Sequence, residues 1–159
     1  IIKNDLYESS NHGYVFELIS KNYDYDKYDG CIIINNGILL NNDIKNNLLT
    51  LDRHKPKIYY SNHSTEKNFA IGFTIIDSKV KHMFYGLGNN FWNEIVYIDS
   101  LSLKQYKEIY KTSMRNMFLF ELINLAIDKG INHWPIKIKQ NSIVKISSTK
   151  DSNRIKEIV

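Results

Sequence analysis

A short polar stretch near residue 112 is the strongest candidate for ligand binding. Lys111 and Arg115 supply positive charge, and Thr112 and Ser113 supply hydroxyl groups. If a helix begins at Thr112, its first backbone N–H groups are free of helical partners and lie in the same turn. Proteins commonly hold phosphate groups with cations, hydroxyls and helix-start N–H groups. The stretch therefore predicts an anion site.

This site depends on a long helix, predicted over residues 112–129. Apolar residues recur there at intervals of three and four, which gives the helix one apolar face, and Gly130 ends it. The chain from residue 57 onward also contains the patterns of other elements. Strands are predicted at 57–61, 69–77, 80–87, 94–101 and 136–139. A polar helix or connection is predicted at 102–110, and a short helix at 141–146. The first three strands should form a meander. The pattern predicts an α/β domain with a mixed sheet of five or fewer strands.

The first 55 residues have a different pattern and are expected to form an appendage. Residues 31–34 and 38–40 are apolar and flank Asn35-Asn36-Gly37, a strong signal for a hairpin turn. A short helix should follow over residues 41–51, capped by Asn42 or Asp43. The predicted organisation is an appendage of hairpin and helix at 1–55, a domain at 56–148 and a polar tail at 149–159.

Composition limits the classes of protein to consider. The 159 residues are 43% hydrophobic and include one cysteine, so a buried core is expected while an internal disulfide is not. A lone cysteine fits a reducing, intracellular compartment, and no apolar run reaches the length of a membrane span. The net charge of +4 slightly favours an acidic partner. The abundance of Asn, Ile and Lys over Ala and Arg indicates an AT-rich genome.

Three segments of the second half resemble the active-site segments of ribonuclease H domains. In that family the first strand ends in Asp-Gly-Ser, where this chain has Asn62-His63-Ser64. The family's long helix begins with a phosphate-contacting turn and carries a Glu one turn later, where this chain has 112–116 followed by Met117. The family's fourth strand ends in Asp-Ser, where this chain has Asn141-Ser142. The resemblance covers roughly residues 57–148 and implies a ribonuclease H-like sheet flanked by helices.

The same resemblance implies that catalysis is lost. Members of the family hold two Mg²⁺ ions with carboxylates, because a hard dication prefers anionic oxygen ligands. The matching positions here are Asn62, Met117 and Asn141, which carry no charge, so neither a metal nor a cofactor is expected. The chain is thus identified as an inactive relative, similar to the connection or tether domains of retroelement reverse transcriptases.

Such a domain would act as a structural or nucleic-acid-positioning module of a larger protein or RNA–protein assembly. The resemblance implies weak, sequence-tolerant contact with nucleic acid and no contact with a membrane. The expected nucleic-acid-binding residues are Ser64, Lys111, Thr112, Ser113 and Arg115.

Other functions remain open at this stage. Residues 95–126 resemble the strand, loop and helix of acetyl-CoA-dependent N-acyltransferases, although 111–116 lacks the expected glycines. Lys27-Tyr28-Asp29-Gly30 matches the Lys-x-Asp-Gly of covalent nucleotidyltransferases, but the intervening Glu-Gly motif is missing. A pure protein-interaction module is a further alternative, for which exposed Trp92 and Trp134 would be the sign.

Overall fold

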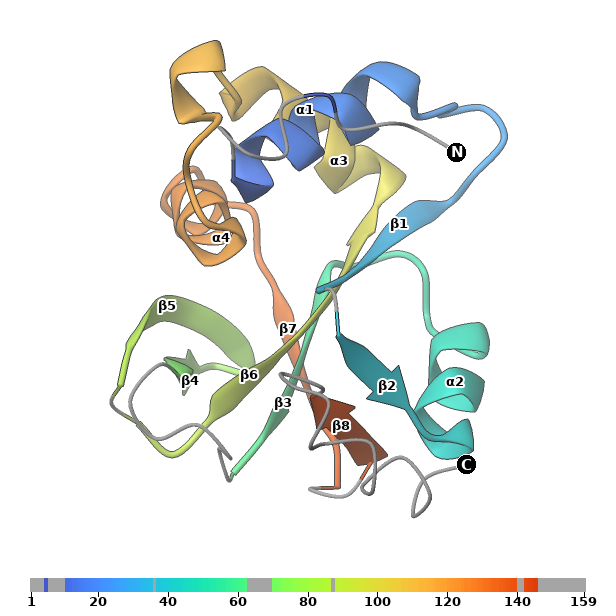
Figure 1. Ribbon diagram of the computed structural model, residues 1–159, viewed down its shortest axis with the longest axis vertical. Helices are drawn as coiled ribbons and strands as arrows, with labels where there is room; N and C mark the ends of the chain where they lie inside the picture. The colour runs from blue at the N-terminus through green and yellow to red at the C-terminus, as the bar shows by residue number, and fades with distance from the viewer. Residues whose placement is uncertain are drawn as a thin grey trace.

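The computed structural model describes residues 5, 11–35, 37–62, 70–86, 88–139 and 142–145. Its helices are α1 (His12–Asn22), α2 (Asn42–Leu49), α3 (Ser100–Ile109) and α4 (Leu119–Asp128), with a 3₁₀ turn at Thr112–Met114. Its strands are β1 (Gly30–Ile34), β2 (Ile38–Leu40), β3 (Lys57–Ser61), β4 (Ile71–Ile76), β5 (Lys79–Tyr85), β6 (Phe91–Asp99), β7 (Trp134–Lys137) and β8 (Ile143–Lys145). Helices α1, α3 and α4 gather at one end of the sheet, and α2 lies apart from them beside β2 (Figure 1).

The main sheet is mixed and is organised around β6. The order of its strands is β5-β4-β6-β3-β7, and β1 joins as a sixth strand beside β6. On one edge β6 pairs with β3, and on the other its second half pairs with β1 while its start meets β4. These pairings are antiparallel, whereas β3 and β7 are parallel. The expected mixed sheet flanked by helices is therefore confirmed, but the expected number of five strands or fewer is wrong, because β1 makes the sheet six-stranded.

The expected meander is wrong, because β6 lies between β3 and β4. Residues 95–99 of β6 are buried on both faces of the sheet, with Ile95, Val96 and Ile98 fully inaccessible. A strand that is apolar on both faces is stable only at the centre of a sheet. The ribonuclease H-like order of strands inferred from residues 57–61 onward does not survive this arrangement.

The hairpin predicted around Asn35-Asn36-Gly37 is also wrong. Strand β1 pairs with β6, and β2 pairs with β8 in a separate two-stranded sheet. Pairing with β6 lets Cys31 and Ile33 pack against the main core, which a two-stranded hairpin could not provide. Because β8 is a strand, the helix predicted at 141–146 is wrong too, and residues 140–141 and 146 lie outside the described part.

The long helix predicted from Thr112 begins only at Leu119, because the N-terminus of α1 competes for its backbone. The N–H groups of Asn11 and Tyr14 donate to the carbonyl of Arg115 at 3.1 Å, and the N–H of Gly13 donates to the carbonyl of Met117 at 3.0 Å. These bonds satisfy helix-start donors of α1 with carbonyls that a continuous helix would have used. Glu121 then caps α4 by accepting from the N–H of Phe118 at 2.7 Å.

A buried carboxylate fixes α1 to this turn. Glu17 is 5% exposed and accepts from two nitrogens of Arg115, at 2.8 and 3.0 Å. It also accepts from Tyr110 at 2.9 Å and Lys21 at 2.6 Å. These donors, Arg115 above all, lower the pKa of Glu17 to about 2. The carboxylate therefore stays charged and joins α1 to the segment between α3 and α4.

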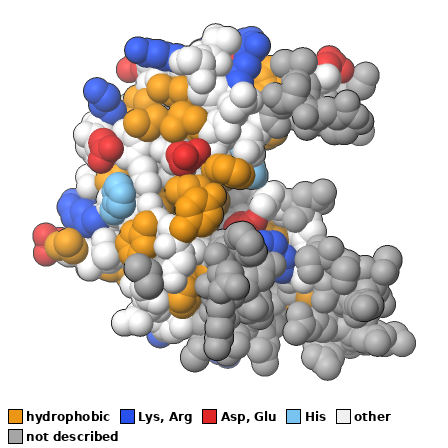
Figure 2. Space-filling model, turned by 60° about the vertical axis from the view of Figure 1, so that its left-hand side comes forward, with side chains coloured by type: hydrophobic (Ala, Val, Ile, Leu, Met, Phe, Trp, Pro, Cys, Tyr) orange, Lys and Arg blue, Asp and Glu red, His pale blue; other side chains and the backbone are white. Residues whose placement is uncertain are grey.

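The hydrophobic core has two parts, one on each side of the sheet. The larger part lies under α1, α3 and α4 and includes Phe16, Phe73, Leu103 and Ile123. The smaller part lies under α2, around Tyr59 and a few aliphatic side chains. On the outside, Figure 2 shows hydrophobic side chains gathered on the face that carries α4 and β5.

The first 55 residues share the main sheet with the rest of the chain, since β1 belongs to it. The domain boundary at residue 55 stays a prediction. Among the described helices, none is long and apolar enough to cross a membrane.

Substitution of Gly13 with Ala should destabilise the protein, because a Cβ there would lie 1.9 Å from the carbonyl oxygen of Met114. The overlap involves backbone on both sides, so we expect a loss of roughly 1 to 3 kcal/mol in the free energy of unfolding. Urea denaturation would measure it. Val15→Ala on the same helix, where the side chain is 37% exposed, is the matched control and should cost much less.

The free energy of unfolding should fall as the pH drops from about 6.5 to about 4, because of His133. This residue is fully buried, with Nε2 2.7 Å from the hydroxyl of Tyr106, and burial lowers its pKa to about 4. The unfolded chain takes up a proton near pH 6.5, while the folded chain resists it, so acid favours unfolding. The full effect approaches about 3 kcal/mol near pH 4. The denaturation midpoint should depend less steeply on pH in His133→Gln than in the original protein. An equal dependence in the two proteins would refute the role of His133.

Candidate functional site

Polar side chains collect where β1 and β3 end. These strands run in the same direction, since each is antiparallel to β6, so their carboxyl ends lie at one edge of the sheet. Asn35 follows β1 directly, and Asn62 follows β3. In open α/β sheets, ligands bind beyond the carboxyl ends of the strands, where connections diverge. The polar side chains at this edge therefore form a candidate ligand site.

Glu94 lies at the centre of this edge in an unusual backbone conformation. Its φ is +58°, a left-handed value that costs a non-glycine residue of order 1 to 3 kcal/mol. Glu94 lies where β6 changes partner: Phe91, its first residue, meets β4, while residues from Ile95 onward meet β1. Strain of this kind persists only where the surrounding structure holds it.

The Glu94 side chain joins three segments that are distant in sequence. Its carboxylate accepts from the side-chain amide of Asn35 and from the ammonium of Lys145, the latter at 2.7 Å. The N–H of Asn35 also donates to the Glu94 carbonyl at 3.1 Å. His12 extends the group, with Nε2 3.4 Å from the Asn35 side-chain oxygen. We call His12, Asn35, Glu94 and Lys145 the Glu94 cluster.

The Glu94 cluster offers more donors than negative charge. Glu94 is its single carboxylate, while Lys145, Asn35 and His12 can all donate hydrogen bonds. His12 Nδ1 is buried with no hydrogen-bond partner among the described residues. The described residues contain no group of three His, Cys, Asp or Glu side chains suited to a metal ion. The ammonium of Lys145 is paired with the carboxylate of Glu94, and Asn35 and His12 add further hydrogen-bonding groups beside this pair.

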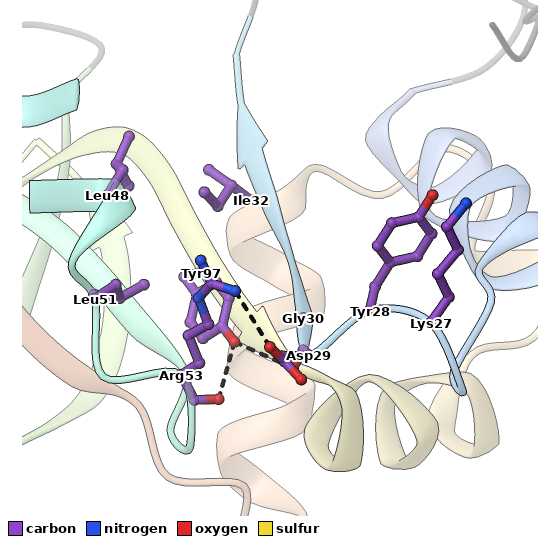
Figure 3. Close-up of a pocket in the computed structure, with 9 residues that line it drawn as sticks. All are labelled: Lys27, Tyr28, Asp29, Gly30, Ile32, Leu48, Leu51, Arg53 and Tyr97. Carbon is purple, nitrogen blue, oxygen red and sulfur yellow. Dashed lines mark hydrogen bonds and ion pairs between the residues drawn. The ribbon is translucent and has the colours of Figure 1, made fainter. Parts of the chain in front are cut away.

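A cavity of about 260 Å³ lies near the other end of β1 and is called here the Tyr97 pocket. The Tyr97 hydroxyl lies 2.9 Å from the carbonyl of Arg53 and 3.2 Å from that of Asp29, and burial raises its pKa to about 12. Arg53 pairs with the Asp29 carboxylate at 3.2 Å, while Lys27 and Tyr28 lie across the start of β1 (Figure 3). The remaining lining residues are Gly30, Ile32, Leu48 and Leu51.

The size and charge of the Tyr97 pocket limit what it can hold. Its volume is below the roughly 300 to 1,000 Å³ typical of sites for drug-sized ligands. Its lining includes two cations, Lys27 and Arg53, and one carboxylate, Asp29, which pairs with Arg53. A small anionic group fits this environment, whereas a whole nucleotide does not.

The residues predicted to bind nucleic acid are only partly brought together. Lys111, Thr112 and Ser113 are exposed on the 3₁₀ turn, but the Arg115 guanidinium is held by Glu17. Ser64 lies outside the described residues. Their contact with nucleic acid stays a prediction.

Of the three expected degenerate positions, Asn62 and Met117 lie in the described structure, and β3, which precedes Asn62, is a parallel neighbour of β7. The Asn62 amide donates to the carbonyl of Asn89 at 2.8 Å beyond β3. Met117 packs against the main core in the loop before α4, and its carbonyl serves α1. Asn141 lies outside the described residues. The grouping of the three positions into one site stays a prediction.

Sequence reasoning missed the Glu94 cluster. The sequence pattern places Asn35 in a hairpin turn, Lys145 in a helix and Glu94 at the start of a strand, and nothing in the pattern connects the three residues. One usable signal was the polar Asn35 directly after the apolar run 31–34, which is typical of a ligand-facing strand end. The motif Lys27–Gly30 was noticed, and all four of its residues line the Tyr97 pocket.

Comparison with known proteins identifies a different relationship from the one expected. No family model and no curated protein sequence matches the chain. Its structure resembles an inositol-1-phosphate CTP transferase from T. maritima, with 14% identity, a TM-score of 0.74 and coverage of 98% of this chain and 63% of that one. It also resembles the CTP:phosphocholine cytidylyltransferase of Streptococcus pneumoniae, with 13% identity, a TM-score of 0.74 and coverage of 98% and 66%.

A third similar structure is a nucleoside-diphosphate-sugar pyrophosphorylase from Vibrio cholerae RC9, with 11% identity, a TM-score of 0.59 and coverage of 93% of this chain and 64% of that one. The chain thus spans about two thirds or slightly less of each of these proteins. The neighbours are nucleotidyltransferase-like, so the ribonuclease H and reverse-transcriptase interpretation is wrong. The prediction of a non-catalytic pseudo-nuclease is therefore wrong as well.

Substitution of Gly30 with Ala should disrupt the Tyr97 pocket. A Cβ at residue 30 would lie 2.3 Å from the Tyr97 hydroxyl oxygen and 2.5 Å from the ring carbon that bears it. Tyr97 would have to move and lose its bonds to Asp29 and Arg53, at a cost of roughly 1 to 3 kcal/mol of stability. A double-mutant cycle measured by urea denaturation would test this: in a Tyr97→Ala background, Gly30→Ala should cost far less, and equal costs in both backgrounds would contradict the contact.

Proposed function

We propose that this chain forms part of a nucleotidyltransferase-like protein and binds a phosphorylated small molecule at the Glu94 cluster. The observation that carries the proposal is the position of the cluster: it lies at the carboxyl ends of β1 and β3, in a fold that resembles CTP-dependent transferases over 98% of the chain. Two neighbours, an inositol-1-phosphate CTP transferase and a CTP:phosphocholine cytidylyltransferase, are named for compounds that are phosphomonoesters.

The charges in the cluster support a phosphate ligand. Lys145 supplies an ammonium and Asn35 an amide N–H, and His12 orients Asn35 through its contact with the side-chain oxygen. Bonds between such donors and a phosphate are stronger than neutral hydrogen bonds, because the acceptor is charged. Glu94 opposes the ligand through its negative charge and at the same time holds Lys145 and Asn35 in place.

The reaction class gives this binding step a role. In nucleotidyl transfer to a phosphomonoester, a phosphate oxygen of the acceptor attacks the α-phosphorus of the nucleotide, a new phosphoanhydride bond forms, and pyrophosphate leaves. Holding the acceptor phosphate in one orientation supplies part of the rate enhancement, since a positioned reactant has already lost its translational freedom. We assign this positioning role to Lys145, Asn35 and His12.

The test is calorimetric titration of the 159-residue chain with phosphocholine, inositol-1-phosphate and glucose-1-phosphate, each compared with its unphosphorylated counterpart. At least one phosphorylated compound should bind, and its counterpart should not. Lys145→Met should raise the dissociation constant about tenfold or more, equivalent to about 1.4 kcal/mol. Failure of all three compounds to bind the folded chain would refute the proposal.

Glu94→Gln provides a control with the opposite sign. It removes the negative charge beside the ligand and the ion pair between Glu94 and Lys145, while a Gln oxygen can still accept from Asn35. We therefore expect tighter phosphate binding in this variant. Lys27→Met in the Tyr97 pocket is the matched lysine control and should leave phosphate binding unchanged. If Lys27→Met abolished binding and Lys145→Met did not, the ligand would bind in the Tyr97 pocket and not at the Glu94 cluster.

A further inference from the structure

The Tyr97 pocket combines apolar walls with a cation that lacks an anionic partner. Figure 3 shows Leu48 and Leu51 on one side of the cavity and Lys27 and Tyr28 on the other, with Ile32 between them. The Lys27 ammonium lies 5.2 Å from the centre of the Tyr28 ring and has no carboxylate partner among the described residues. A cation beside a partly enclosed cavity attracts an anion more strongly than it would in bulk water, because the local dielectric constant is lower.

The charges that line the pocket decide between two kinds of anion. Two cations, Lys27 and Arg53, and one carboxylate, Asp29, leave one positive charge in excess. Arg53 and Asp29 pair at 3.2 Å, so the excess charge is that of Lys27. A phosphomonoester carries close to two negative charges at neutral pH and would make the site negative overall. A singly charged carboxylate would make it neutral, which favours a carboxylate.

The apolar part of the lining requires an apolar body on this carboxylate. Ile32 is 41% exposed and Tyr28 is 50% exposed, so a ligand over them would remove apolar surface from water. The cavity of about 260 Å³ has room for about nine water molecules, at about 30 Å³ each. A single ring or a short branched chain fills such a space.

The backbone around the pocket is held in place by hydrogen bonds from other elements. The hydroxyl groups of Tyr23 and Ser100 both donate to the carbonyl of Tyr28, at 2.8 and 2.6 Å. The N–H of Ser100 donates to the carbonyl of Asp29 at 2.9 Å, and the Tyr97 hydroxyl lies 3.2 Å from the same oxygen. A preformed site loses less affinity to ordering than a site that must fold around its ligand.

We propose that the Tyr97 pocket is a second ligand site, which binds a small carboxylate with an apolar ring or branched chain. The carboxylate pairs with Lys27 and with the guanidinium nitrogens of Arg53 that Asp29 does not use. The apolar body lies against Ile32 and the side chains of α2 and the loop after it. The pocket is at the start of β1 and the Glu94 cluster at its end, so this proposal does not rest on phosphate binding.

Nuclear magnetic resonance titration of the isotope-labelled 159-residue chain with benzoate would test the proposal. We expect saturable shifts of the backbone amide signals of residues 27–32 and of Leu51, with a dissociation constant in the millimolar range expected for so small a ligand. Benzyl alcohol lacks the charge and acetate lacks the ring, so each should bind about tenfold more weakly or not at all. Benzoate shifts that do not saturate, or equal binding of either control compound, would overturn the proposal.

Substitutions in the pocket show whether benzoate binds there. Lys27→Met should raise its dissociation constant about tenfold, because a charge-assisted bond is lost. Ile32→Thr keeps the branched Cβ but removes apolar contact, and should raise it about threefold. Asp29→Asn removes the competing carboxylate and should lower it. Lys81→Met, at an exposed position on β5, is the matched control and should leave it unchanged.

The variants also contain the result that would refute the site. If benzoate bound Lys27→Met and the original chain equally well, it would bind outside the Tyr97 pocket and the proposal would be wrong. Amide spectra of each variant without ligand check that it is folded. Since benzoate contains no phosphate, this titration can fail while the phosphate titration succeeds, and the reverse.

Discussion

The rest of the structure depends on the burial of β6 on both faces. Its second half, Ile95 to Asp99, is inaccessible from either side, so other strands must flank it on both edges. β3 takes one edge, and the other is divided between β1 and β4. Glu94, with its left-handed backbone, lies at the division. The strained residue and the Glu94 cluster are therefore local results of a constraint on the whole sheet.

A second constraint is the attachment of α1. Its helix-start N–H groups and the buried Glu17 both take partners from the segment that follows α3. The effect is to end one helical stretch early and to start α4 at Leu119. The Arg115 side chain is used structurally as a result, which leaves Lys111 as the exposed cation of the turn.

Sequence reasoning succeeded where local pattern determines local structure. The strands over 57–61, 69–77, 80–87 and 94–101 and the helices at 41–51 and 102–110 all appear, with shifts of a few residues. It failed where a partner distant in sequence decides the outcome. β1 is a strand either way, but nothing within residues 31–40 indicates that it pairs with β6 and not with β2.

The Glu94 cluster could not be predicted from the sequence for the same reason. The ribonuclease H-like interpretation rests on short matches at Asn62, Met117 and Asn141 in a chain rich in Asn, and the position of β6 between β3 and β4 contradicts the strand order that it implies. The Glu94 cluster joins residues 12, 35, 94 and 145, with no two close enough in sequence to form a motif. A left-handed Glu leaves no trace in the sequence.

The distance between β1 and β6 along the chain also affects how the protein is made. Ile34 pairs with Ile95, so the ribosome must add roughly 60 residues after β1 before its partner exists. At synthesis rates of about 5 to 20 residues per second, this takes roughly 3 to 12 s. Throughout that interval three consecutive isoleucines are without the strand that pairs with them. Until β6 has been made, this aliphatic run is exposed to any other unpaired strand.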